Sequence, residues 1–368
     1  MPELWAENSL GRWNDLFEIY NLLKSVLHHC IMKSVLITGA TGFIGRHVVT
    51  EALARKYHVR ALVRASSSGK TEIEALGVEI ALGDMTDFSS LQSACSGINI
   101  VFHCAGIVTD WAPRELYDQV NIQGMENLCR AALGAKVDRL VYMSTNDVFG
   151  PVEDVVIDET FPVNSHAWKE PYPDTKIEAD KIAWRYHHEH GLPVSMVYAC
   201  WVYGKGDTTF IPLTADAILK KDMIFWRKDA HTWPNYIDNL MDLMFLLAEH
   251  PAAIGNGYLS HDGEMVTFQD LCRDLAIALD VKPITTHIPY FLAMMAGKLM
   301  EFWWKLTKKK TRPLITTYTV KNLGSRLNFS IEKAERELGW TPKISYQEGM
   351  KRTIEWLKTL DLDDLKQK

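Results

Sequence analysis

A short apolar run followed by three evenly spaced glycines constrains the fold of this chain more than any other feature. Residues 33–45 read Lys-Ser-Val-Leu-Ile-Thr-Gly-Ala-Thr-Gly-Phe-Ile-Gly. The run at 35–37 suits a strand that is buried on both faces. Gly39, Gly42 and Gly45 let the backbone approach a pyrophosphate, and a helix beginning near Gly42 directs its free N–H groups and positive dipole end at the charge. We expect a phosphate cradle here, with a ligand-free tight turn as the alternative.

Beyond the glycines, short apolar runs alternate with stretches of helical periodicity. The expected strands are 35–37, 59–63, 78–81, 98–103, 140–144 and 194–198, and the expected helices include 46–56, 88–95 and 117–133. Strands interleaved with helices predict an α/β fold with a doubly wound parallel sheet, a Rossmann fold, whose ligands bind at the carboxyl ends of the strands. We expect a cofactor-binding domain at 32–200 that carries the catalytic residues. A smaller, mostly helical substrate lobe is expected at 201–368, with some segments returning to the sheet.

Composition excludes several classes of function. The chain has 368 residues, 47% of them hydrophobic and 23% charged, and a formal net charge of -6, so nucleic acid is not an expected partner. Its six cysteines form no pair or Cys/His cluster at metal-ligand spacing, so we expect reduced thiols in a cytoplasmic protein and no metal site. No apolar run reaches the ~18 to 20 residues that span a bilayer.

Residues 1–31 precede the first expected strand. Leu16, Ile19, Leu23 and Leu27 recur at helical spacing, which predicts a short amphipathic helix but not a secretory signal. This extension is either an anchor or dimer arm, or a consequence of a start site upstream of Met32.

Arg64 lies just past the second expected strand, where an acidic side chain would bind the ribose 2'-hydroxyl of NAD. An arginine can pair bidentately with a 2'-phosphate, so NADP(H) is favoured and NAD(H) is the second choice. An ordinary solvated arginine is the alternative.

Tyr172 and Lys176 are candidates for proton-transfer chemistry. They are four residues apart, so a helix beginning near Tyr172 places both on one face. A lysine ammonium beside a phenol favours the phenolate, so we expect the pKa of Tyr172 to fall from ~10 toward working pH. Such a tyrosine can exchange a proton with a carbinol oxygen while hydride moves to or from nicotinamide. Ser144 and Thr145 end the fifth expected strand, between the glycines and this pair.

The segment from Thr38 to Gly45 resembles the opening of the extended short-chain dehydrogenases/reductases, within the NAD-dependent epimerase/dehydratase superfamily. The Ser/Thr, Tyr, Lys arrangement resembles the catalytic set of the same family. Residues 198–207 resemble its R-P-x-x-V-Y-G-P-G-D segment, with Tyr198, Ala199 and Lys205 departing from Arg, Pro and Pro. Residues 235–240 and 260–267 resemble the 3β-hydroxysteroid dehydrogenase branch, and 330–340 and 346–350 resemble the terminal helices of the wider family. The resemblance covers residues 33 to about 360.

The resemblance assigns roles residue by residue. It implies a catalytic set of Thr145, Tyr172 and Lys176 supported by Asn121, with Ser144 as the second choice for the hydroxyl. It places Asp84 near the adenine amino group and makes a homodimer the expected assembly. The implied cofactor-binding residues are Thr38, Gly39, Thr41, Gly42, Phe43, Ile44, Gly45, Arg64, Asp84, Met85, Ala105, Gly106, Tyr172 and Lys176.

Three functions compete on this fold: an alcohol/ketone oxidoreductase acting on a bulky apolar substrate (a sterol, a triterpenoid or a long-chain 3-keto compound), a nucleotide-sugar epimerase or dehydratase, and an idle cofactor-binding scaffold. The intact catalytic set argues against the scaffold. Sugar-nucleotide enzymes need arginines for a diphosphate, yet residues 186–226 contain none. Such enzymes usually carry an arginine ahead of the position of Tyr236 as well, but residues 232–234 read Thr-Trp-Pro. Aromatic residues that instead suit an apolar cleft, or the core, are Trp201, Phe210, Phe225, Trp226, Trp233, Phe291, Phe302, Trp303 and Trp304. The oxidoreductase is favoured.

Residues 290–312 predict an amphipathic helix ending in a basic cluster. The stretch 291–306 carries only Lys298, Glu301 and Lys305 as charges, and Lys308, Lys309, Lys310 and Arg312 follow. Such a helix can lie in a lipid headgroup layer, which predicts a peripheral membrane contact beside the substrate entrance. The alternative is a helix packed on the small lobe, followed by a solvated basic turn.

Overall fold

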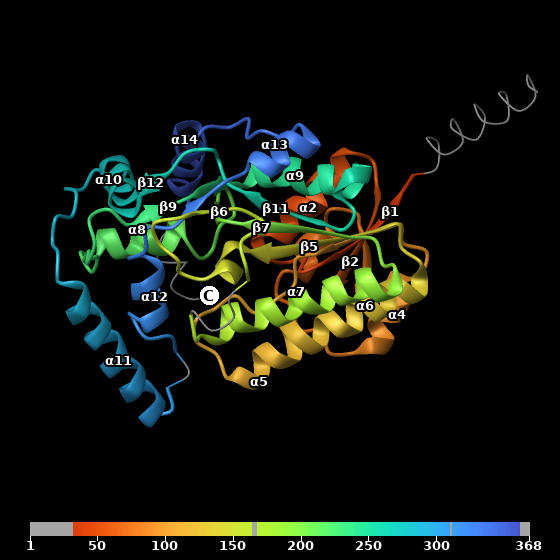
Figure 1. Cartoon of the computed structure of the whole chain (residues 1–368), viewed down its shortest axis with the longest axis horizontal. Helices are drawn as coiled ribbons and strands as arrows, with labels where there is room; N and C mark the ends of the chain where they lie inside the picture. The colour runs from red at the N-terminus through yellow and green to blue at the C-terminus, as the bar shows by residue number, and fades with distance from the viewer. Residues whose placement is uncertain (1–31, 164–167, 310, 361–368) are drawn as a thin grey trace, which may run out of the picture.

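The computed structural model describes residues 32–163, 168–309 and 311–360. The helix predicted within 1–31 and Lys310 of the basic cluster lie outside these ranges. Figure 1 shows the described chain as a sheet enclosed by helices, with a lobe at one end.

Seven parallel strands form the central sheet in the order β11-β7-β5-β4-β1-β2-β3. The order runs outward from β1 in both directions, so the predicted doubly wound Rossmann sheet is confirmed. β1 is flanked by β2 and β4, with Ile37 opposite both Ala61 and Phe102. The strands are β1 Ser34–Thr38, β2 His58–Val63, β3 Glu79–Leu82, β4 Ile100–His103, β5 Arg139–Thr145, β7 Val194–Ala199 and β11 Asn256–Ser260.

Helices cover both faces of the sheet. In Figure 1, α2 and α9 lie on one side, and α4, α6 and α7 lie on the other. The expected helix 117–133 consists of α5, a six-residue π-helical segment η2, and α6, so it is continuous but locally wider than an α-helix. The bounds are α2 Phe43–Ala54, α3 Lys70–Glu74, α4 Phe88–Cys95, α5 Arg114–Tyr117, η2 Asp118–Gln123, α6 Gly124–Ala135, α7 Pro171–His190 and α9 Ile237–Glu249.

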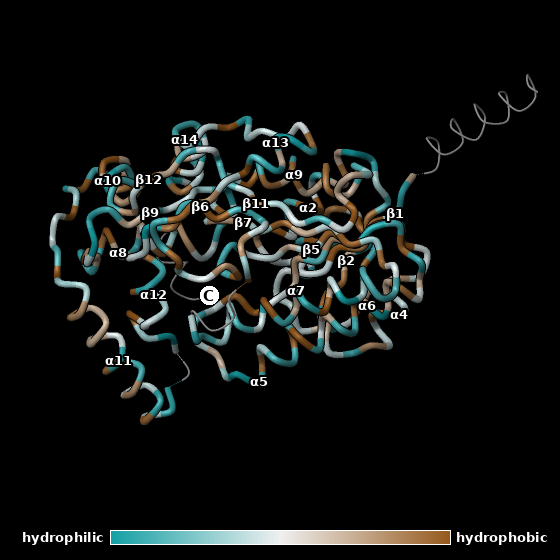
Figure 2. Tube along the Cα trace, viewed as in Figure 1, coloured by the Kyte–Doolittle hydropathy of each residue, from teal (hydrophilic) through white to brown (hydrophobic). Residues whose placement is uncertain are grey.

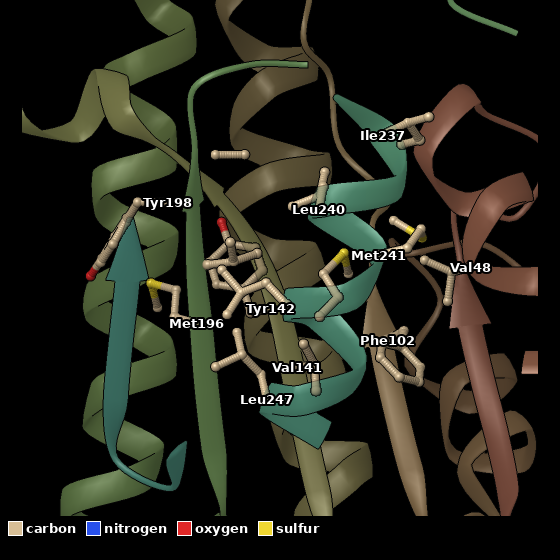
Figure 3. Close-up of a cluster of buried hydrophobic side chains, with 14 of the residues drawn as sticks. Val48, Phe102, Val141, Tyr142, Met196, Tyr198, Ile237, Leu240, Met241 and Leu247 are labelled. Carbon is tan, nitrogen blue, oxygen red and sulfur yellow. The ribbon is translucent and has the colours of Figure 1, made fainter. Parts of the chain in front are cut away.

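The core lies between α9 and the middle strands. Figure 3 shows Leu240, Met241 and Leu247 of α9 beside side chains from β4, β5 and β7. Phe102 packs on Phe245 with ring centroids 4.9 Å apart, and both rings are fully buried. Since apolar burial is the main favourable term in folding, this layer fixes the middle strands and the candidate catalytic residues at their carboxyl ends.

The segment after residue 200 builds the lobe, yet it also returns β11 and α9 to the central sheet. Within the described residues, no helix is both long and apolar enough to cross a bilayer. The remaining elements are η3 Asn146–Phe149, β6 Val156–Ile157, β8 Trp201–Tyr203, α8 Ile211–Leu219, β9 His231–Thr232, β10 Pro234–Tyr236, η4 Pro251–Ala253, β12 Val266–Thr267, α10 Phe268–Ala278, α11 Tyr290–Leu306, α12 Thr317–Asn322, β13 Asn328–Phe329, α13 Glu332–Leu338 and α14 Tyr346–Leu357.

Candidate active site

The three glycines form a tight turn between β1 and α2. Gly39 has a φ of +72°, and the Gly42 N–H donates to its carbonyl oxygen at 2.9 Å. A Cβ added to Gly45 would lie 2.1 Å from that oxygen, so the helix can approach the strand this closely only with glycine. No described side chain caps α2 at Gly42, so its first N–H groups face outward, with Phe43 and Ile44 half-buried in the first turn. This geometry fits the pyrophosphate of a dinucleotide.

Thr38 connects β1 to β4. Its hydroxyl lies 2.7 Å from Nδ1 of His103 and accepts from the Ala105 N–H at 3.3 Å. Thr38 is fully buried, so its side chain holds the loop at Ala105 and Gly106 in place. Burial, and secondarily the nearby Lys176 charge, lower the pKa of His103 to about 3, so its imidazole is neutral.

A basic corner lies beside the glycine turn. Arg64 is exposed at the end of β2, and its guanidinium has no hydrogen-bond or ion-pair partner among the described residues. Thr41 accepts from Ser67 at 3.1 Å and, through its carbonyl, from Nε of Arg46 at 3.1 Å. Arg46 also pairs with Glu72. Arg46 is a second cation at this corner that sequence reasoning missed, although its place one residue after Gly45 was a usable signal.

The loop after β3 is fixed at both of its predicted cofactor residues. Asp84 accepts from the backbone N–H of Thr86 at 2.9 Å and from its hydroxyl at 2.7 Å. The Met85 carbonyl accepts from Asn127 of α6 at 3.0 Å, in a buried contact. The loop therefore stays at the carboxyl edge of the sheet, beside β2.

Asn121 lies buried in the π-helical segment and joins two parts of the site. Its Oδ1 accepts from the Ile107 N–H at 2.8 Å, and its Nδ2 donates to Thr175 Oγ1 at 3.1 Å. Thr175 lies between the two catalytic candidates on α7. A Cβ on Gly106 would lie 3.3 Å from Oδ1 of Asn121, so the loop after β4 passes close to this amide. Asn121 is therefore a positioning residue.

Thr145 and Tyr172 meet where β5 and α7 come together. Burial and, secondarily, the Asp147 carboxylate raise the pKa of Tyr172 well above 10, against the lowering effect of the neighbouring Thr145 hydroxyl. This is opposite to the expected lowering. The Lys176 ammonium donates to the Met143 carbonyl at 2.8 Å and lies 4.3 Å from the Tyr142 ring centroid. Lys176 therefore does not offset the effects of burial and of Asp147 on Tyr172.

Ser144 faces away from Tyr172. Its Oγ donates to the carboxylate of Asp180, one turn after Lys176 on α7. Burial lowers the pKa of Lys176, whereas the Asp180 carboxylate raises it. Sequence reasoning missed Asp180, although its spacing of four from Lys176 predicts the same helix face.

Asp147 and Tyr318 form a second contact beside the site that the sequence did not reveal. Asp147 is buried in η3 and accepts a hydrogen bond from Tyr318 of α12. Burial raises the pKa of Asp147 to about 6, against the lowering effect of that hydrogen bond. The backbone carbonyl of Asp147 accepts from Trp168 at 2.8 Å, and Trp168 packs edge-on against Tyr318. Tyr318 of the lobe thus contacts the segment that directly follows β5.

The aromatic residues expected near a substrate do not gather in one place. Phe225 is buried, Trp226 donates to the Val320 carbonyl at 2.9 Å, and Trp233 donates to the Leu327 carbonyl at 2.7 Å. Phe291, Phe302 and Trp303 lie on α11 and are 55–67% exposed, so the expectation that they line a cleft is wrong for these three. The cause is the orientation of α11, which packs through small residues.

A family model described as the NAD dependent epimerase/dehydratase family matches residues 35–259. A 4-hydroxy-2-methyl-3-oxo-4-farnesyl-3,4-dihydroquinoline-1-oxide ketoreductase of Stigmatella aurantiaca is 27% identical, over 85% of this chain and 93% of its own. A 3-beta-hydroxysteroid dehydrogenase of Mycolicibacterium neoaurum is 28% identical, over 89% and 92%. A 2-alkyl-3-oxoalkanoate reductase of Shewanella oneidensis is 27% identical, over 86% and 84%.

Two solved structures illustrate the structural similarity. The crystal structure of gox2253 has a TM-score of 0.75 and 27% identity, covering 89% of this chain and 98% of that one. A dTDP-glucose 4,6-dehydratase of Streptomyces venezuelae, solved with NAD bound, has a TM-score of 0.71 and 24% identity, covering 88% and 97%. At that identity the dehydratase supports the fold alone.

Proposed function

We propose that this chain, which belongs to the NAD dependent epimerase/dehydratase family of extended short-chain dehydrogenases/reductases, reduces a ketone on a bulky apolar substrate with NADPH. The family and the named relatives establish a nicotinamide-dependent ketone/alcohol oxidoreductase of the 3β-hydroxysteroid dehydrogenase-like kind. The observation that carries the finer proposal is the convergence of Thr145, at the end of β5, with Tyr172 and Lys176 of α7, where the Thr145 hydroxyl acts on the phenol of Tyr172 and Lys176 donates to the Met143 carbonyl of the same strand.

The proposed mechanism assigns one task to each of these residues. Bound NADPH would supply the hydride that reduces the carbonyl carbon. Tyr172 gives its phenolic proton to the carbonyl oxygen as charge develops there. Thr145 donates a hydrogen bond to the same oxygen, and Lys176 would hold the nicotinamide ribose. Burial and Asp147 keep Tyr172 protonated, which is the form that can donate a proton to the carbonyl oxygen.

Two cations support NADP(H) over NAD(H). Arg64 is exposed, and among the described residues its side chain has no partner, so its guanidinium can pair with a 2'-phosphate without first breaking an ion pair. Arg46, whose Nε donates to the Thr41 carbonyl, is the second cation at this corner, and it already pairs with Glu72.

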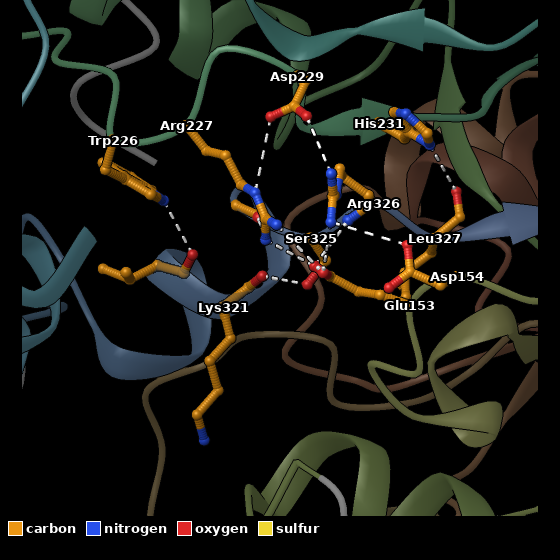
Figure 4. Close-up of polar contacts among 12 residues, drawn as sticks. Glu153, Asp154, Trp226, Arg227, Asp229, His231, Lys321, Ser325, Arg326 and Leu327 are labelled. Carbon is orange, nitrogen blue, oxygen red and sulfur yellow. Dashed lines mark hydrogen bonds and ion pairs between the residues drawn. The ribbon is translucent and has the colours of Figure 1, made fainter. Parts of the chain in front are cut away.

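The substrate lobe argues against a nucleotide sugar. Two arginines of the lobe, Arg227 and Arg326, are engaged by Glu153, as Figure 4 shows. Arg227 donates to both Glu153 carboxylate oxygens, at 2.7 and 3.2 Å, and Arg326 also pairs with Asp154 and Asp229. Binding a diphosphate there would break these ion pairs and bring the phosphates near three carboxylates. The epimerase or dehydratase alternative therefore has less support, and the names of the relatives favour ketones with apolar substituents.

The test is NADPH oxidation with three kinds of substrate. We expect turnover with a 3-ketosteroid or a 2-alkyl-3-oxoalkanoate, and neither turnover nor competition with UDP-glucose or dTDP-glucose. Conversion of a nucleotide sugar, or its competition at micromolar concentration, would reverse the assignment. Absence of hydride transfer to any ketone despite tight NADPH binding would support the idle scaffold.

A further inference from the structure

The helix α11 packs on the protein through its smallest residues. Its buried positions are Ala293 and Gly297. A Cβ on Gly297 would lie 3.2 Å from backbone atoms of Thr316 and Thr317, so the helix backbone rests directly on the start of α12. On the same side, the Glu301 carboxylate accepts from the Thr317 N–H at 2.6 Å and from its hydroxyl at 2.8 Å. The contact of α11 with α12 is therefore made by small and polar groups, with Met300 and Trp304 half-buried on the same side of the helix.

The large apolar side chains of α11 point outward. At about 100° per residue they occupy a strip covering roughly a third of the circumference. The apolar strip consists of Phe291 (67% exposed), Met295 (52%), Leu299 (63%), Phe302 (64%), Trp303 (55%) and Leu306 (61%). A surface helix of a soluble protein normally turns its apolar side inward. A contiguous outward strip of this kind marks an interaction site. Figure 2 shows brown positions along α11 at the outer margin of the lobe.

The charge around the apolar strip indicates what covers it. Lys298 and Lys305 are exposed along one border, and Lys308 and Lys309 are exposed just beyond the helix end. The acidic residue in 290–312 is Glu301, which faces inward. A second copy packed on the same face would bring lysines near lysines, whereas an anionic bilayer accepts both the apolar side chains and the cations.

We propose that the apolar strip and the basic segment after it bind the headgroup layer of an anionic phospholipid bilayer. α11 then lies parallel to the membrane, with its apolar side chains among the upper acyl chains. This proposal is independent of the reaction, but its use rests on the proposed function, since an apolar ketone is concentrated in bilayers.

This surface is joined to the active site by short contacts. Arg312, after the helix, donates to Asp110 at 2.7 Å, and Asp110 also accepts from Thr316 at 2.7 Å. Asp110 belongs to the loop that continues from Gly106. α12 itself carries Tyr318, the hydrogen-bond donor to Asp147. The bilayer-facing helix thus lies next to two segments that border the catalytic residues.

The experiment is co-sedimentation of the full chain with vesicles of phosphatidylcholine, with and without phosphatidylglycerol. We expect binding that requires phosphatidylglycerol and weakens with salt. A charge variant, with Lys308, Lys309 and Lys310 changed to Gln, should bind about 100-fold more weakly. The matched control changes the exposed Lys136, Lys351 and Lys358 to Gln and should bind like the parent. A strip variant, with Phe291, Phe302 and Trp303 changed to Ser, should lose binding while folding normally.

The proposal would be overturned if the parent stays in solution or if the charge variant sediments like the parent. It would also be overturned if binding is lost only when Ile19 and Leu23 in the N-terminal extension are changed to Ser. A dimer in solution that the strip variant dissociates, without any vesicle binding, would contradict it as well. Turnover of a water-soluble ketone separates the two proposals. If the parent reduces that ketone but never sediments with vesicles, the proposed reductase function is supported and the proposed membrane surface is refuted. Sedimentation with vesicles but no turnover of any ketone would support the membrane surface and refute the reductase function.

Discussion

The hydroxyl of Ser144 donates to both carboxylate oxygens of Asp180, at 2.8 and 3.0 Å, and so it is turned away from the catalytic tyrosine. Thr145 is the next residue and the last of β5, and its hydroxyl acts on Tyr172, which lies two turns before Asp180 on the same helix α7. The two hydroxyls therefore have separate tasks. Ser144 holds a buried carboxylate in place, and under the proposed mechanism Thr145 is the hydroxyl that binds the substrate oxygen.

Removing each hydroxyl should therefore have a different effect. Thr145→Val deletes a donor to the developing oxyanion, so we expect kcat to fall about 10²- to 10³-fold. Ser144→Ala leaves Asp180 with one donor fewer, so we expect a loss of about 1–3 kcal/mol in the free energy of unfolding and a smaller loss of turnover. Steady-state kinetics and denaturant unfolding of both variants measure the two effects. The reverse ranking in kcat would move the catalytic role to Ser144.

Tyr172→Phe should abolish turnover without weakening NADPH binding. The change removes the proton donor, while the glycine turn that would hold the pyrophosphate remains intact. Lys176→Met should weaken both turnover and NADPH binding, because it removes the ammonium that would hold the ribose. NADPH dissociation constants and single-turnover rates separate these effects. Substantial ketone reduction by Tyr172→Phe would refute the proton-transfer role.

Asp180→Asn should move the alkaline limb of the kcat/KM profile to lower pH. The Asp180 carboxylate raises the pKa of Lys176 against the lowering effect of burial, so its removal lets Lys176 lose its proton at lower pH. The amide still has an oxygen that can accept from Ser144, so the local structure is kept. The profile for ketone reduction, with Glu189→Gln at the exposed end of α7 as control, measures the shift. An unchanged limb, or one moved to higher pH, would show that this charge does not act on Lys176.

The sequence was informative where one element carries the whole signal. Gly39, Gly42 and Gly45 predict the cradle because a strand, a turn and a helix follow one another there, and the spacing of Tyr172 and Lys176 predicts one face of α7. The buried strands were also readable, because apolar runs of that length require burial on both faces.

Contacts made by the tertiary fold were not readable. The pairing of Asp147 with Tyr318 joins residues 171 positions apart, and nothing near either one in the chain signals the other. The pKa of Tyr172 rises because burial and Asp147 act on it, which spacing alone cannot show. The outward face of α11 was likewise hidden, since its apolar residues match a helix packed on either side, and only the close contact of Gly297 with α12 decides the orientation.

Arg64→Asp should reverse the preference between the two cofactors. Loss of a charge-assisted pair with the 2'-phosphate costs about 1.5–3 kcal/mol, so we expect NADPH to bind roughly 10- to 100-fold more weakly. NADH should bind equally well or better, because the new carboxylate can accept from the ribose 2'-hydroxyl. Arg336→Asp, at a side chain that is 66% exposed on α13, makes the same charge change elsewhere and should leave the ratio unaltered. A constant ratio of dissociation constants in Arg64→Asp would mean that another residue, with Arg46 the first candidate, distinguishes the cofactors.

Gly45→Ala should damage cofactor binding and stability together, whereas Gly134→Ala should improve stability alone. The Cβ at position 45 would lie 2.1 Å from the Gly39 carbonyl oxygen and 2.6 Å from its carbon, and these are backbone atoms that can move only if the turn opens. We expect a loss of about 1–3 kcal/mol in the free energy of unfolding and little remaining affinity for NADPH. Gly134 lies in α6 with no heavy atom within 4 Å of an added Cβ, so alanine there should stabilise the protein by roughly 0.5–1 kcal/mol. Calorimetric unfolding with and without NADPH measures both effects. If Gly45→Ala still gains stability from NADPH as the parent does, the close approach of β1 and α2 is not what holds the dinucleotide.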